Sequence, residues 1–118
     1  MLVAVPVKEK GLDAKVDERF ARSEHMLIYD TDKEAVDFAN NDDLGAHGAG
    51  PAVVEKLLNK KVSHLICKNL GKNAYIALKQ AGIKVYVAEE DTARENIERL
   101  KRGELKAYST PRDSHYGI

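Results

Sequence analysis

The sequence predicts an α/β domain with a five-stranded mixed sheet in the order 3-2-1-4-5, with strand 2 antiparallel and helices on both faces. One indication is an apolar N-terminal run followed by two shorter runs in a hairpin pattern. Another is the alternation of helix-period and β-branched apolar segments over the remaining chain. Because crossovers between parallel strands are right-handed, these units place the later strands parallel to the first.

The first strand is predicted from "LVAVPV", residues 2–7, a continuous apolar run typical of a buried strand. Pro6 cannot donate a ladder hydrogen bond, so full pairing should end near it. A charged connection, residues 8–24, follows, and we expect it to be a solvated loop. A connection of this length in a compact domain is often functional.

A hairpin is predicted next, from "HMLIYD" at residues 25–30 and the alternating "AVDFA" at residues 35–39. The segment "TDKE" between them supplies turn residues. The first helix should run from Pro51 to about Lys60, since proline suits the first helical position.

Further strands are predicted at residues 62–67 and 83–88, on either side of a second helix that Gly82 terminates. A third helix should begin after Thr92, which forms a capping box with Glu95. The strand and helix order is therefore β-β-β-α-β-α-β-α.

Length, charge and cysteine content limit the possible functions. The 118 residues predict one domain over residues 1–106 and a polar tail over residues 107–118. Nineteen basic residues balance nineteen acidic ones, so the basic excess typical of nucleic-acid binding is missing. No apolar run is long enough to span a bilayer, and the single Cys67 cannot form an internal disulfide. We therefore expect a cytoplasmic protein that binds neither nucleic acid nor membrane.

In the predicted sheet, strands 1, 3 and 4 end at one edge. Three connections leave from there: residues 8–24, 40–50 and 68–72. Ligands in open α/β sheets bind at such carboxyl edges, where the crossovers diverge. The edge is therefore the predicted ligand site.

The segment "GAHGAGPAVVEKLL" places three of the eight glycines of the chain within six residues, directly before the first helix. Gly45, Gly48 and Gly50 let a ligand approach the backbone closely, and the helix beginning at Pro51 offers free amides to an anion. His47 between them can donate a hydrogen bond or ligate a metal. The competing interpretation is a flexible strand-to-helix connector. The segment matches neither the P-loop nor the dinucleotide pattern.

A second polar turn, "KNLGKN" at residues 68–73, enters the next helix at the same edge. Asn69 is predicted to cap that helix, and Gly71 can bring the backbone close to a ligand. Cys67 and His64 lie in the preceding apolar strand, where a packed thiol and a packed imidazole are favoured over ligands.

These stretches together resemble the dinitrogenase iron–molybdenum cofactor biosynthesis family, which includes NifX-like proteins and the C-terminal domain of NifB. The resemblance covers nearly the whole chain, through "VAVPV", "LDAKVDERFARSEHMLIYD", the glycine loop and "VSHLICKNLGKNAYIALKQAGIKVY". It implies a ribonuclease-H-like three-layer fold. It also implies binding of an iron–sulfur or iron–molybdenum cluster, or its precursor, rather than catalysis.

Many members of the family carry a histidine directly before the phenylalanine of "DERF", where it is implicated in holding the cluster. This chain has Arg19 before Phe20. Arginine cannot coordinate iron, but it can pair with an anionic cluster or an organic acid.

Three functions follow from the sequence. The first is a non-catalytic carrier or chaperone for an anionic cluster or small ligand, exchanging it with cluster-assembly proteins. The second is a protein-interaction or regulatory module with a vestigial pocket. The third, a metal-dependent nuclease, is disfavoured because strands 1 and 4 contain no carboxylates. The predicted binding residues, of which His47 is the metal ligand, are Arg19, Phe20, Gly45, His47, Gly48, Gly50, Asn69 and Gly71.

Overall fold

The computed structural model describes residues 1–40 and 49–109. Its strands are β1 (Leu2–Val7), β2 (His25–Asp30), β3 (Ala35–Asn40), β4 (His64–Cys67) and β5 (Lys84–Val87). Its helices are α1 (Ala49–Asn59), α2 (Lys72–Ala81) and α3 (Ala93–Lys101). The strands lie in the order β3-β2-β1-β4-β5, with β2 antiparallel to both its neighbours and β4 parallel to both of its own. The predicted fold class and strand order are confirmed.

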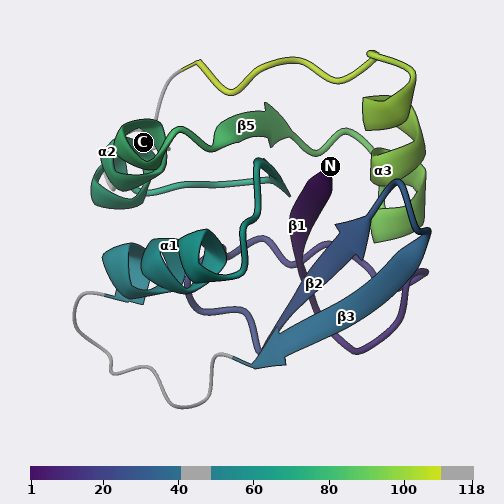
Figure 1. Cartoon of the computed structure of the whole chain (residues 1–118), viewed down its shortest axis with the longest axis horizontal. Coiled ribbons are helices and arrows are strands. Elements are labelled where there is room, and N and C mark those ends of the chain that lie inside the picture. The colour runs from purple at the N-terminus through teal and green to yellow at the C-terminus, as the bar shows by residue number, and fades with distance from the viewer. Residues whose placement is uncertain (41–48, 110–118) are drawn as a thin grey trace.

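The sheet is the middle of three layers, with α1 and α2 on one face and α3 on the other (Figure 1). Alternation along the strands separates the two cores. Ala4 and Met26 pack on the α1–α2 side, whereas Val5 and Leu27 pack on the α3 side. Each fully buried Val, Leu or Met side chain contributes roughly 1.5–3 kcal/mol to folding, so both cores stabilise the sheet.

The connection between β1 and β2 is not the solvated loop that its charge suggested. Val16 is fully buried, and Phe20 is 4% exposed. Val16 forms an isolated bridge with Val7, and its amide donates to the carbonyl of Asp91 at 2.9 Å. The single apolar residues between the charges anchor the connection to both cores.

Helix and strand boundaries differ from the predicted ones by two residues or fewer. Helix α1 begins at Ala49, so Pro51 is its third residue rather than its first. The missing amide costs nothing there, because first-turn amides have no intrahelical acceptor. Strand β4 begins at His64 rather than at residue 62, because the Val62 amide still donates to the carbonyl of Leu57 at the end of α1.

The predicted helix ends at Gly82 and Thr92 are confirmed. Gly82 caps the C-terminus of α2 with φ of 76°, a left-handed conformation that favours glycine. The Thr92 side chain and Glu95 form a reciprocal capping box at the start of α3.

The segment predicted as a polar tail begins inside the fold. Ala107 forms a bridge with Tyr86 of β5, and Tyr108 is only 6% exposed within the core on the α1–α2 side. Residues 107–109 therefore pack against the domain. Over the described ranges, no helix is long and apolar enough to cross a membrane.

Candidate functional site

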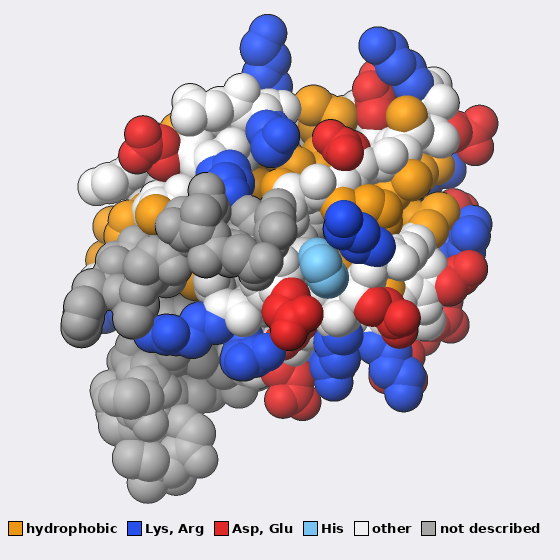
Figure 2. Space-filling view, turned by 90° about the horizontal axis from the view of Figure 1, so that it is seen from below, with side chains coloured by type: hydrophobic (Ala, Val, Ile, Leu, Met, Phe, Trp, Pro, Cys, Tyr) orange, Lys and Arg blue, Asp and Glu red, His pale blue; other side chains and the backbone are white. Residues whose placement is uncertain are grey.

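Strands β1 and β3 end at the carboxyl edge on either side of the first residue of β2. His25, the first residue of β2, pairs with Val7 at the end of β1 and with Asn40 at the end of β3. Figure 2 shows the side of the molecule on which the arrowhead of β3 lies in Figure 1, and there acidic and basic side chains are mixed. The charge pattern therefore points to local ion pairs rather than to one extended field.

Residues 17–20, which we call the arm, carry a fixed cation at this edge. Asp17 is 5% exposed, and its Oδ1 accepts from the Arg19 amide at 2.9 Å and from Arg19 Nε at 3.3 Å. Its Oδ2 accepts from Arg19 Nη2 at 3.4 Å. The hydrogen bonds and charge of Asp17 raise the pKa of Arg19, whose side chain is 63% exposed. A buried carboxylate thus aims an exposed, permanently charged guanidinium.

The arm contacts residues 68–71, which we call the turn. Arg19 and Asn69 form an isolated parallel bridge, and Asn69 Nδ2 donates to the carbonyl of Glu18 at 3.4 Å. The structure therefore brings together two predicted site residues from connections that are distant in sequence.

The prediction that Asn69 caps α2 is wrong. The N-cap is Gly71, with an extended backbone, and no side chain caps this helix end. The side-chain amide of Asn69 instead donates a hydrogen bond to the arm, because the turn passes beside Glu18.

A cavity of about 350 Å³ opens beside the arm, and its described lining is Lys8, Asp17, Glu18, Arg19 and Glu24. Two of these residues are cations and three are acids. Asp17 is neutralised by Arg19 at hydrogen-bond distance, which leaves Lys8 opposing two exposed glutamates. The cavity is polar. Whether it binds an anion or a cation depends on which of these side chains the ligand contacts.

Two residues of this region face the interior. Phe20 is 4% exposed and packs in the core on the α1–α2 side, so its ring anchors the arm rather than lining the cavity. Cys67 is fully buried at the end of β4, and burial raises the pKa of its thiol well above the ordinary value. A protonated thiol enclosed in apolar side chains does not ligate a metal.

The other predicted binding residues belong to the glycine loop and the start of α1. Gly45, His47 and Gly48 lie outside the described residues, and Gly50 is the second residue of α1. The loop leaves the sheet from Asn40, which pairs with His25 at the carboxyl edge. The roles of these four residues therefore stay predictions.

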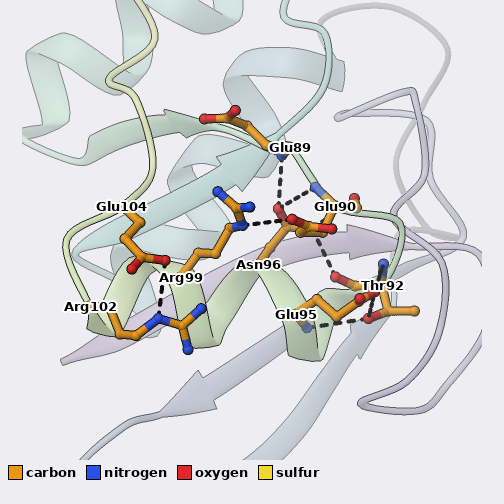
Figure 3. A network of polar contacts seen from close by, with 8 residues as sticks. All are labelled: Glu89, Glu90, Thr92, Glu95, Asn96, Arg99, Arg102 and Glu104. Carbon is orange, nitrogen blue, oxygen red and sulfur yellow. Dashed lines mark hydrogen bonds and ion pairs between the residues drawn. The ribbon is translucent and has the colours of Figure 1, made fainter.

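A buried asparagine on α3 also shapes this edge, and the sequence reasoning missed it. Asn96 is fully buried, and its Oδ1 accepts from the amides of Glu89 at 2.9 Å and Glu90 at 3.1 Å. Its Nδ2 donates to the carbonyls of Glu90 at 3.0 Å and Thr92 at 2.8 Å (Figure 3). A polar residue between the apolar positions Ala93 and Ile97 was the available signal.

Residues 89–92, which Asn96 holds in place, in turn contact residues 13–16, directly before the arm. The carbonyl of Asp91 accepts from the Val16 amide, and the Ala93 amide donates to the carbonyl of Ala14 at 3.0 Å. The Arg94 side chain pairs with Asp13, with Nε 2.6 Å from Oδ1. Residues 13–16 therefore bond to the first turn of α3 and to the connection before it. These bonds fix the chain directly before the arm.

Within residues 1–40 and 49–109, no group of three His, Cys, Asp or Glu side chains is placed to hold a metal ion. What the described edge offers is a positioned guanidinium, backbone amides and a polar cavity. The guanidinium and the amides suit an anion better than a bare metal ion. The lining of the cavity holds one more acid than cations, so an anion has to contact Arg19 or Lys8 and stay clear of Glu18 and Glu24.

Comparisons with known proteins show which family and which fold this chain shares. The sequence model of the family described as "Dinitrogenase iron-molybdenum cofactor" matches residues 1–103. The apo form of the orange protein from Desulfovibrio gigas is 30% identical, with a TM-score of 0.87 over 93% of this chain and 94% of that one. A candidate NifB protein from Thermotoga is 43% identical, with a TM-score of 0.81 over 92% and 94%. An uncharacterized protein of Methanocaldococcus jannaschii is 29% identical over 92% of each chain.

Proposed function

The chain belongs to the dinitrogenase iron–molybdenum cofactor family, and we propose that it is a small carrier for an anionic metal–sulfur cluster or its precursor. The family and the relatives named above support a role in cofactor binding or biosynthesis. The cluster is the cargo in this proposal, and cluster-assembly proteins deliver and receive it. The carboxyl edge of the sheet is the proposed binding surface.

The observation that carries the proposal is the Asp17–Arg19 pair at the rim of the cavity. A free arginine side chain loses about 2 kcal/mol of rotamer entropy when it is immobilised on a ligand. Here Asp17 has already restricted the side chain, so less is lost on binding. Arg19 therefore contributes charge and direction, but no bond to the metal.

The amino end of α2 adds partial positive charge beside the arm. Its N-cap Gly71 has no side-chain cap, and the first turn contains no acidic residue. The first amides of a helix lack intrahelical acceptors, and the helix dipole favours an anion at this end. Because the backbones of Asn69 and Arg19 form a bridge, this helix end follows directly on the turn that contacts the arm.

The described residues fit an anionic cargo, but they offer it no metal–thiolate bond. Cys67 is buried and protonated. We propose that charge and hydrogen bonds hold the cluster, with His47 of the glycine loop as the one protein ligand to its metal. Binding of this kind is readily reversible, which suits a carrier that hands its cargo on.

Anaerobic titration of the apo protein with a dianionic iron–sulfur cubane cluster bearing small thiolate ligands tests the proposal. We expect wild type to take up the chromophore. Arg19→Gln should weaken binding by about tenfold or more, since a charge-assisted hydrogen bond contributes roughly 1.5–3 kcal/mol. Lys33→Gln, at the exposed hairpin turn, removes the same charge away from the edge and serves as the matched control.

Three results separate the parts of the proposal. If wild type takes up no chromophore, the carrier function is refuted. Equal affinities of wild type and Arg19→Gln would refute the role of the guanidinium. Equal affinities of wild type and His47→Ala would remove His47 as the ligand while leaving the carrier function intact.

A further inference from the structure

The chain that follows α3 closes the β5 edge of the sheet. Residues 104–109, which we call the strap, run antiparallel to β5 (Figure 1). The Val87 amide donates to the carbonyl of Lys106 at 2.9 Å, and the Tyr108 amide donates to the carbonyl of Val85 at 2.8 Å. The strap lies beyond residues 1–103, the part of the chain that the family model matches.

The strap ends in a buried tyrosine that reaches the turn. Tyr108 is 6% exposed, and its hydroxyl accepts from the Leu70 amide at 3.1 Å. Its ring centroid lies 5.9 Å from that of Tyr75 on α2. The Tyr75 hydroxyl donates to the carbonyls of Tyr108 at 3.5 Å and Ser109 at 3.3 Å, which fastens the strap to α2.

Leu70 is the residue through which this contact reaches the candidate site. It is 1% exposed and lies between Asn69, which pairs with Arg19, and Gly71, which begins α2 without a side-chain cap. The Tyr108 hydroxyl therefore holds the turn from the interior, while the neighbouring Asn69 contacts the arm.

We propose that Tyr108 is a positioning residue for the ligand site, an inference that rests on the carrier function proposed above. By holding the Leu70 amide, its hydroxyl sets the turn at the distance at which Asn69 reaches the carbonyl of Glu18. Without this bond, the buried amide has to find another acceptor, and the turn moves away from the arm to do so. Ligand affinity then falls although no residue that touches the ligand has changed.

Tyr108→Phe in the full chain tests this, because it removes the hydroxyl and keeps the ring. Tyr75→Phe is the matched control: it removes a hydroxyl that holds the same strap but does not contact the turn. The test has three readouts for each variant. They are amide hydrogen exchange followed by NMR, thermal stability, and affinity for the iron–sulfur cubane cluster. We expect Tyr108→Phe to lose exchange protection selectively at Asn69, Leu70 and Gly71 and to bind the cluster about five- to tenfold more weakly.

The control should retain both properties within about twofold of wild type. The proposal is overturned if Tyr108→Phe loses protection uniformly over the molecule, or if its affinity matches that of Tyr75→Phe. Failure of wild type to take up the cluster is a separate result that refutes the carrier function. In that case hydrogen exchange alone tests whether Tyr108 positions the turn. Loss of protection in Tyr108→Phe confined to the turn supports that role, and loss spread over the molecule refutes it.

Discussion

Replacing the buried Asn96 of α3 by alanine should destabilise the protein markedly. The substitution removes the acceptor of two backbone amides and the donor to two carbonyls, all within the connection over residues 89–92. A buried polar group left unpaired costs about 1–3 kcal/mol. Because Glu89 is exposed and Glu90 is half-buried, water satisfies part of the deficit. The higher helix propensity of alanine returns about half a kcal/mol.

We therefore expect the free energy of unfolding to fall by about 3 kcal/mol. For a chain of this length, that corresponds to a decrease in Tm of roughly 12 °C. Urea unfolding followed by circular dichroism measures the change, with an unchanged m-value as the check on two-state behaviour. Thr92→Ala is the control, since loss of an exposed cap costs about 1 kcal/mol.

The reasoning is refuted if Asn96→Ala costs no more than Thr92→Ala. A second readout concerns the segment that the connection supports. Because the carbonyl of Asp91 accepts from the Val16 amide, Asn96→Ala should also increase hydrogen exchange at Val16. Unchanged exchange there would show that the connection keeps its shape without Asn96.

Three further outcomes follow from single residues. Gly82→Ala should lower the free energy of unfolding by about 1 kcal/mol because of its left-handed backbone. Gly11→Ala should change it by less than about half of that, because Gly11 lacks such a backbone and its added Cβ would make only an ordinary contact, 3.9 Å from the Ala14 amide nitrogen. The hydrogen bond from Arg94 lowers the pKa of Asp13, so its stabilising effect is present above the unfolded value of 3.8 and is lost as the pH falls through the lower folded value. The stability difference between wild type and Asp13→Asn should therefore shrink in acid, and equal differences at pH 7 and pH 2.5 would contradict this. The buried Cys67 thiol should react with an aromatic disulfide reagent many-fold more slowly in the native protein than in urea.

The fold was largely predictable because its signals are local. The continuous apolar run at residues 2–7, the hairpin pattern and the two helix ends at Gly82 and Thr92 each depend on neighbours within a few residues. Right-handed crossovers then leave few ways to arrange these elements. Errors in the helices were small shifts of a boundary, as at Pro51, where several positions in the first turn tolerate a missing amide. The packing of Val16 and Phe20 from the charged connection was not predicted, because it depends on the two cores.

The candidate site was predictable only in part. The carboxyl edge follows from strand order, and Arg19 and Asn69 do meet there. The inward orientation of Phe20 and the structural role of Asn96 were not evident, because an aromatic residue in a charged segment and a lone polar residue in a helix each allow several environments. Their environments are set by packing against elements far away in the chain.

The amino-acid sequence by itself determined the layers and the strand order, because periodicity and chain connectivity carry that information. The strand order also fixes which strand ends share the edge that we propose as the ligand site. The tertiary structure decided which residues meet at that edge. Asn69 contacts Glu18 across 51 positions, and Tyr108 contacts Leu70 across 38. Such pairs leave no periodic signal in the sequence. Each forms only when the packing of both cores brings two distant segments within hydrogen-bond distance.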